Sequence, residues 1–158
     1  MKDLHIDIHI HSACYEELDE TQRRLVDAAK EATSHSYSPY SHFAVGAAVL
    51  LADGTIVSGS NQENAAFPSG TCAERTTVFY ANSRYPDQPV CTLAIAARNE
   101  SGFVDTPIPP CGACRQVLLE TEQRYRQPMH IILYGEKKIF LIDGVKSLLP
   151  LSFGAEFL

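Results

Sequence analysis

The sequence predicts an α/β fold in which a mixed five-stranded sheet lies between helices, a three-layer α-β-α arrangement, with one extra strand at the N-terminus. Residues 20 to about 34 carry apolar side chains at helical spacing. Residues 90–97 and 129–134 are continuous apolar runs, typical of central strands covered on both faces. After the extra strand, the order helix, two strands, helix, strand, helix, two strands favours a sheet with helical layers.

The chain of 158 residues is long enough for one domain with a substantial core. We expect an N-terminal strand extension over residues 1–18 and a single main domain over residues 19–158. Thirteen basic and nineteen acidic residues give a net charge of −6, which argues against a nucleic-acid substrate. No apolar run is long enough for a membrane span. Five cysteines suggest no disulfide framework, so a reducing cytoplasm is expected.

The first predicted element is a half-buried strand over residues 4–10. Apolar and polar residues alternate strictly there, which is the period of a strand. The apolar face holds Leu4, Ile6, Ile8 and Ile10. The polar face, continued by one residue, holds His5, Asp7, His9 and His11. These four side chains could bind a second metal, but a solvated edge strand protected by charge is favoured.

The next elements are a helix and a hairpin. Asp19 can cap a helix from Glu20 to about Ser34, whose small apolar residues suggest close packing on the sheet. A turn-rich loop follows, and residues 42–51 and 55–60 are predicted strands. Asp53 and Gly54 form the turn between them.

The rest of the chain alternates helices and strands. Helices are predicted over residues 72 to about 83 and 111 to about 123. The strand over residues 129–134 should run parallel to the strand over 90–97, because a helix connects them. A short strand at 137–141 and a helical turn at 145–149 complete the domain.

Two short stretches carry the chemistry, and we expect them to meet in space. Cys111 and Cys114 are three residues apart and share a face in the first turn of a helix. Cys72 and Glu74 can converge only if Cys72 stands at a helix entrance, so both stretches should be helix N-termini. Three thiolates without a fourth ligand indicate a catalytic zinc with one open position. Glu74 is then expected to be the general acid/base, as in the zinc deaminases.

The electrostatics of this site depend on its helices. Zinc with three thiolates has a net charge of −1, which weakens its activation of water. Each helix N-terminus contributes roughly half a positive charge. Arg75, next to Glu74, can hydrogen-bond a sulfur and add more positive charge.

Other interpretations of these residues remain open. Thr71 and Glu74 also match a capping box, and a lone Cys-x-x-Cys could be a redox pair or part of a structural zinc site. A structural site would need a fourth ligand such as His35 or His42. The joint occurrence of both stretches favours the catalytic zinc.

The sequence resembles the small cytidine deaminases of pyrimidine salvage from about residue 20 to the C-terminus. The blocks that carry the resemblance occur in family order. They are Pro39-Tyr40-Ser41-His42-Phe43, Val45-Gly46-Ala47-Ala48, Asn61-x-Glu63-Asn64-Ala65, Cys72-Ala73-Glu74-Arg75, Pro110-Cys111-Gly112-Ala113-Cys114-Arg115-Gln116, Leu148-Leu149-Pro150 and Ser152-Phe153-Gly154.

The resemblance implies a cytidine-deaminase-like fold and one zinc per subunit on Cys72, Cys111 and Cys114, with Glu74 as general acid/base. It implies that Asn61 and Glu63 bind the ribose 3′-hydroxyl, and that the Ala73 backbone reads the pyrimidine edge. Phe43 should line the base pocket, and Phe153 should stack on the base from a neighbouring subunit of a homotetramer. The implied substrates are cytidine and deoxycytidine.

One departure concerns Phe67, where the family often has tyrosine. The missing hydroxyl removes a contact that can reach the ribose 5′-hydroxyl. An aminonucleoside-antibiotic deaminase remains a rival, since it shares the zinc motifs, but Asn61, Glu63 and Phe153 favour a plain nucleoside.

Overall fold

The computed structural model describes residues 1–158 and contains one mixed sheet with helices on both faces. The strands follow the order β1-β7-β6-β4-β2-β3, and β5 pairs with β4. Their bounds are β1 Ile10–Ala13, β2 Ala44–Leu51, β3 Ile56–Ser60, β4 Val90–Asn99, β5 Gly102–Phe103, β6 His130–Tyr134 and β7 Ile139–Asp143. β4 and β6 are parallel, as predicted, and the other pairs are antiparallel.

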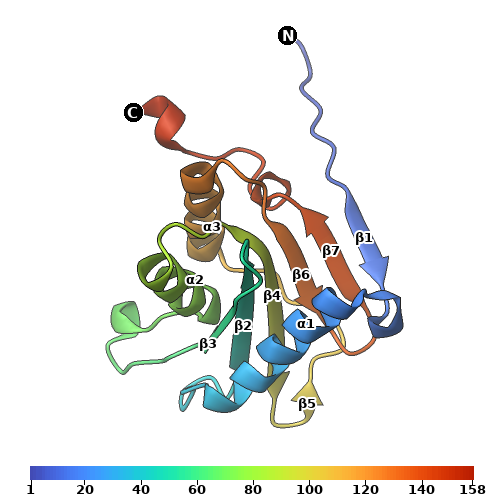
Figure 1. Ribbon diagram of the computed structural model, residues 1–158, viewed down its shortest axis with the longest axis vertical. Helices are drawn as coiled ribbons and strands as arrows, with labels where there is room; N and C mark the ends of the chain where they lie inside the picture. The colour runs from blue at the N-terminus through green and yellow to red at the C-terminus, as the bar shows by residue number, and fades with distance from the viewer.

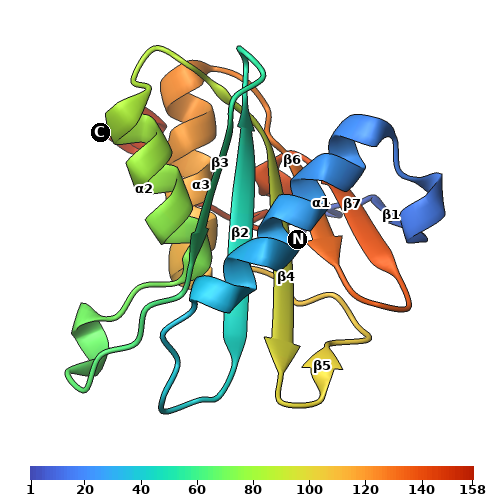
Figure 2. The same ribbon diagram turned by 60° about the horizontal axis from the view of Figure 1, so that its bottom comes forward.

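Three α-helices form the outer layers. They are α1 Glu20–Ala32, α2 Ala73–Arg84 and α3 Gly112–Tyr125. Helix α1 crosses one face of the sheet, and α2 and α3 lie side by side on the other (Figure 2). None of these helices has the length and apolar character needed to cross a membrane.

The core is divided by the sheet because strand residues alternate between its faces. In β2, Ala47 and Val49 pack toward α2 and α3, while Ala48 packs toward α1. Helix α1 packs very close to β2, since a Cβ on Gly46 would meet the backbone oxygen of Ala29. The small residues of α1 therefore permit the close packing that the sequence predicted.

Two sequence-based details of the sheet are wrong. The predicted strand over residues 4–10 is displaced, because only Ile10–Ala13 pair with β7. The sheet also has seven strands, whereas five plus an N-terminal strand were expected. The additional one, β5, has only two residues and pairs with the end of β4, which is too short for a periodic pattern.

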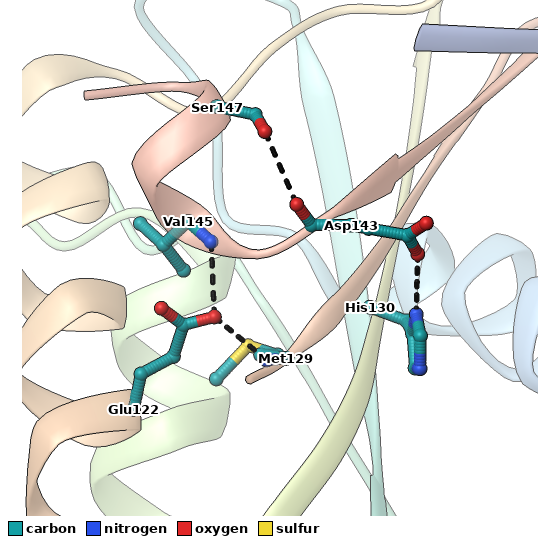
Figure 3. A network of polar contacts seen from close by, with 6 residues as sticks. All are labelled: Glu122, Met129, His130, Asp143, Val145 and Ser147. Carbon is teal, nitrogen blue, oxygen red and sulfur yellow. Dashed lines mark hydrogen bonds and ion pairs between the residues drawn. The ribbon is translucent and has the colours of Figure 1, made fainter. Parts of the chain in front are cut away.

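Local hydrogen bonds fix the ends of the helices. Asp19 caps α1 by accepting from the Gln22 N–H at 2.8 Å, as predicted. Near the end of α3, one Glu122 carboxylate oxygen accepts from the Met129 N–H at 2.6 Å and the Val145 N–H at 2.9 Å (Figure 3). This carboxylate joins α3 to the start of β6 and to the turn after β7. It therefore helps to hold α3, which carries part of the candidate site, in place.

Candidate metal and nucleoside site

The two chemistry-bearing stretches meet where α2 and α3 begin. Cys72 and Cys111 are the N-cap residues of α2 and α3, both with extended backbone, and Cys114 lies in the first turn of α3. No side chain caps either helix, so their positive N-terminal ends face the cluster. The N-cap of α2 is Cys72 and not Thr71, which removes the capping-box interpretation of Thr71 and Glu74.

The three thiols have the spacing of a metal site. The Sγ atoms of Cys72 and Cys111 are 3.7 Å apart, and those of Cys111 and Cys114 are 3.5 Å apart. Tetrahedral zinc with Zn–S bonds of about 2.3 Å separates its sulfurs by about 3.8 Å, whereas a disulfide is about 2.05 Å long. All three sulfurs lie within 4.8 Å of one another, and no histidine or carboxylate joins the group. The donor set therefore fits zinc with one position left open.

Arg75 supplies positive charge to this cluster. Its Nη2 donates to Cys72 Sγ at 3.6 Å, and its Nε is buried without a partner. Hydrogen bonds from Cys114, and then from Arg75 and Cys111, lower the pKa of Cys72 to about 5, although burial opposes the change. The pKa of Cys114 is raised, because it is hydrogen-bonded to Cys72 and buried. The Arg75 guanidinium thus favours the thiolate form of Cys72.

Glu74 is a buried carboxyl next to the thiols, with 5% of its surface exposed. Burial is the largest cause of its raised pKa, and the nearby Cys72 thiolate adds to it. A carboxyl in such a place exchanges its proton nearer to neutral pH than an exposed glutamate does. This is the property required of a general acid/base.

A cavity of about 600 Å³ opens over these groups, a size typical of small-molecule sites. Most of the predicted site residues line it. They are Asn61, Glu63, Cys72, Ala73, Glu74, Arg75 and Cys111. The structure thus brings the metal cluster, the candidate acid/base and two polar candidates for substrate binding to one cavity.

Asn61 is already engaged by its own chain. Its Oδ1 accepts from the Val45 N–H at 2.8 Å and from the Ser36 hydroxyl at 2.6 Å. Its Nδ2 donates to the Phe43 carbonyl at 3.0 Å. A primary amide has two N–H donors, so one remains for a ligand. Asn61 therefore holds the cavity wall together and has a single free donor.

Glu63 presents the complementary group. Its Oε2 accepts from the backbone N–H groups of Tyr40 at 2.9 Å and Ser41 at 3.3 Å. Hydrogen bonds from Ser41 and Tyr40 lower the pKa of Glu63, so the group is a carboxylate at neutral pH. Its other oxygen, Oε1, has no hydrogen bond within the chain. Together, Asn61 and Glu63 offer one donor and one acceptor, which matches a hydroxyl group.

Two predicted aromatic residues do not line the cavity. Phe43 contributes its carbonyl to Asn61, but its side chain is not part of the cavity wall. Phe153 is 60% exposed and stacks on Phe157, with ring centroids 5.7 Å apart, in the C-terminal tail. Gln116 of α3 donates to the Phe153 carbonyl at 2.8 Å. Within one chain, Phe153 thus faces outward and does not reach the site.

Tyr40 and Phe67 form an aromatic edge of the cavity, and of these two only Phe67 was expected near the substrate. Their rings meet edge to face at 6.0 Å, and both are more than half exposed. The turn-rich composition around Tyr40 indicated only a loop. Tyr40 reaches this edge because its N–H donates to the Glu63 carboxylate of another loop. A pattern within either loop alone does not reveal that contact.

Comparison with protein families gives a match over most of the chain. Residues 19–127 match the family model described as the cytidine and deoxycytidylate deaminase zinc-binding region. A cytidine deaminase of Halalkalibacterium halodurans is 42% identical over 99 residues, which cover 63% of this chain and 70% of the relative. One from Sporosarcina psychrophila is 45% identical over 97 residues, covering 61% and 67%.

Solved structures give the same result. A cytidine deaminase from Burkholderia pseudomallei superposes with a TM-score of 0.71 at 34% identity, covering 82% of this chain and 97% of the other. One from Mycobacterium tuberculosis has a TM-score of 0.66 at 33% identity, covering 86% and 99%. The likeness includes both cysteine-bearing helices, since the family match spans them.

Proposed function

The chain belongs to the cytidine and deoxycytidylate deaminase family, and from this premise we propose that it deaminates cytidine and deoxycytidine by hydrolysis. The products are uridine or deoxyuridine and ammonia. The observation that carries the proposal is the buried Glu74 carboxyl beside three converging thiols in one cavity. A nucleoside brings to that cavity a planar base and a hydroxylated sugar.

The metal proposed for this site is zinc, one per subunit, held by Cys72, Cys111 and Cys114. When bound there, zinc supplies Lewis-acid activation of the water that hydrolyses the base. The two helix N-termini and the Arg75 guanidinium offset the negative charge of three thiolates.

Glu74 moves the protons in the proposed reaction. Its carboxylate accepts a proton from the attacking water and donates it to N3 of the base. It then takes the proton of the hydroxyl added at C4 and passes it to the amine, so that the C4–N bond breaks, ammonia leaves and a C4 carbonyl remains. The burial that raises the pKa of Glu74 supports this exchange, because such a carboxyl accepts and releases its proton closer to neutral pH than an exposed glutamate does.

The sugar and base have separate contacts in the proposal. The free Nδ2 hydrogen of Asn61 and the free Oε1 of Glu63 suit the ribose 3′-hydroxyl, which both donates and accepts. The backbone of Ala73, at the start of α2, is proposed to read the pyrimidine edge. Phe43 is proposed to support the base side of the cavity through the loop that Asn61 holds.

The assembly is proposed to be a homotetramer acting in pyrimidine salvage in the cytoplasm. Phe153 is exposed and anchored to α3 by Gln116, which supports its presentation to the site of a neighbouring subunit. The partner of the site is a small nucleoside, and no nucleic acid or membrane takes part.

Three rival functions make different demands on the site. A structural zinc module requires a fourth protein ligand, and neither His35 nor His42 joins the thiols. An aminonucleoside-antibiotic deaminase would use the same metal and Glu74, so only the substrate distinguishes it. A polynucleotide deaminase requires a basic channel, which a net charge of −6 does not favour.

The experiment that tests the proposal is an ultraviolet assay of the zinc-loaded protein with cytidine, deoxycytidine and free cytosine. Conversion of both nucleosides, with much slower conversion of cytosine, is expected because the sugar contacts position the base. Blasticidin-type nucleosides serve as the competing substrate class. Turnover of these without turnover of cytidine would contradict the proposal.

A further inference from the structure

The N-terminal segment ends the sheet with an open edge. β1 is the last strand in the sheet order and pairs with β7 on one side only. Residues 1–9 belong to no strand ladder, and Figure 1 shows them running outward from β1, beyond the sheet. The family match begins only at residue 19, so this segment lies outside the part of the chain that carries the deaminase site.

This segment exposes a row of aliphatic side chains. Leu4 is 81% exposed, and Ile6, Ile8 and Ile10 are each between 46% and 48% exposed. Sheet edges are usually protected by charge, proline or a cover, because an open edge pairs with other strands. An exposed segment that alternates aliphatic and polar residues and leads into an open sheet edge therefore points to a strand partner.

We propose that residues 4–12 pair antiparallel with the same residues of a second copy of this chain, with Ile8 on the two-fold axis. The two sheets then join edge to edge through β1. In this register Ile8 faces the partner's Ile8, and Ile6 faces the partner's Ile10. The aliphatic residues of both copies share one face of the joined strands, because residues directly opposite in an antiparallel pair point to the same side.

The two faces of the segment together select this register. With Ile8 on the axis, Asp7 lies opposite the partner's His9, so a carboxylate meets an imidazole. With Asp7 on the axis instead, two carboxylates would face each other, which is unfavourable. With Ile6 on the axis, Ile10 would face the partner's Lys2, and the aliphatic row would be interrupted by charge.

Disulfide trapping tests the register directly. Three single cysteines, Ile6→Cys, Asp7→Cys and Ile8→Cys, are introduced separately into the zinc-loaded Cys14→Ser protein. Directly opposite Cα atoms are about 4.5–5.5 Å apart, within disulfide range, whereas residues offset by two are about 7–8 Å apart. Under mild oxidation, the Ile8→Cys protein should form a two-chain species on a non-reducing gel at least tenfold faster than the other two.

Two double variants, each with two added lysines, test the contact itself by light scattering. Ile6→Lys/Ile8→Lys should lower the mass of the assembly, while cytidine turnover per chain changes less than twofold, because this contact lies outside the deaminase site. The matched variant His5→Lys/His9→Lys adds the same charge to the polar face, where a lysine can face the partner's Asp7, and should keep the mass. An unchanged mass in the first variant overturns the proposal. So does trapping by Ile8→Cys that is no faster than by its two neighbours.

Discussion

Glu74 is the residue on which the proposed chemistry depends most directly. Replacing it by glutamine keeps the size of the side chain but removes the proton that it must carry. Since general acid/base catalysis typically contributes about 10²–10⁴ in rate, the Glu74→Gln protein should lose at least a hundredfold in kcat. It should keep one zinc per chain, because no carboxylate belongs to the thiol cluster.

The measurement combines metal analysis with the ultraviolet assay on the same preparation. Glu63→Gln is the matched control, since it changes the other carboxylate of the cavity from acid to amide. This control should mainly raise KM for cytidine, because the Glu63 carboxylate faces the sugar in the proposal. A Glu74→Gln protein with wild-type kcat would show that another group moves the proton.

Phe67 sets a second prediction, on the 5′-hydroxyl of the substrate. The exposed Phe67 ring at the cavity edge has no hydroxyl to offer this group. 5′-Deoxycytidine should therefore have a kcat/KM within about threefold of that for cytidine. Phe67→Tyr is the matched variant and should restore a preference for cytidine.

A loss of kcat/KM for 5′-deoxycytidine equivalent to about 1–3 kcal/mol in the unmodified protein would contradict this, since that is the usual cost of an unpaired polar group. Such a loss would mean that another group binds the 5′-hydroxyl. Tyr40, whose ring meets Phe67 edge to face, would be the first candidate.

At the residue scale, the sequence predicted the cluster of three thiols but not how the candidate substrate-binding side chains are hydrogen-bonded. Cys72, Cys111 and Cys114 were predictable because ligand spacing and helix entrances are local properties. The hydrogen bonds of Asn61 within the chain were not predictable, because its amide bonds to groups 16 to 25 residues away along the chain. Such contacts depend on how loops close over one another, which a local pattern does not encode.

At the element scale, the length of a strand is set by its partner as much as by its own pattern. Residues 4–10 alternate as a strand should, yet only Ile10–Ala13 are paired. The partner β7 has just five residues, and its register matches Ile142 to Ile10. The alternation upstream of Ile10 therefore has no partner within its own chain. The helices, by contrast, were predicted closely because caps such as Asp19 are local.

The end of α3 gives an element-scale prediction. Glu122→Ala would leave the Met129 and Val145 N–H groups without their shared acceptor. Hydrogen bonds to charged groups are worth about 1.5–3 kcal/mol each, less when partly exposed. The free energy of unfolding should fall by about 2 kcal/mol, measured by urea denaturation of the zinc-loaded protein.

Glu122→Gln is the control for charge, since its carbonyl oxygen can still accept from both N–H groups. It should lose about half as much stability as Glu122→Ala. Equal stability of Glu122→Ala and the unmodified protein would mean that water replaces the carboxylate at both N–H groups. In that case Glu122 would not be what holds α3 against β6 and β7.

At the scale of the whole molecule, the hydrophobic core on both faces of the sheet is separate from the three thiols of the site. The two buried clusters on either face of the sheet contain 17 and 10 residues, and none of the three thiols belongs to either. Of the candidate metal ligands, Cys72 and Cys111 stand at helix entrances and line the cavity, whereas Cys114 is buried in the first turn of α3. The fold therefore has a core that is complete without the metal.

This separation predicts what happens when zinc is removed by a chelator. The protein should remain folded, with an unchanged far-ultraviolet circular dichroism spectrum, but should lose cytidine turnover. Free zinc at about a thousandfold its Kd stabilises the folded state by about 4 kcal/mol. Since 1 kcal/mol shifts the Tm of a domain of this size by about 2–4 °C, removal should lower the Tm by roughly 8–16 °C.

The same titration separates a catalytic zinc from a structural one. Adding zinc back should restore turnover and Tm together, with a stoichiometry of one per chain, while magnesium should restore neither, because thiolates select zinc over hard cations. Cys114→Ser, which removes one ligand from the first turn of α3, should behave like the chelated protein. Unfolding upon chelation would instead mean that the metal supplies the folding free energy, as in small structural zinc domains. The cavity beside Glu74 would then have to be explained without an open metal position.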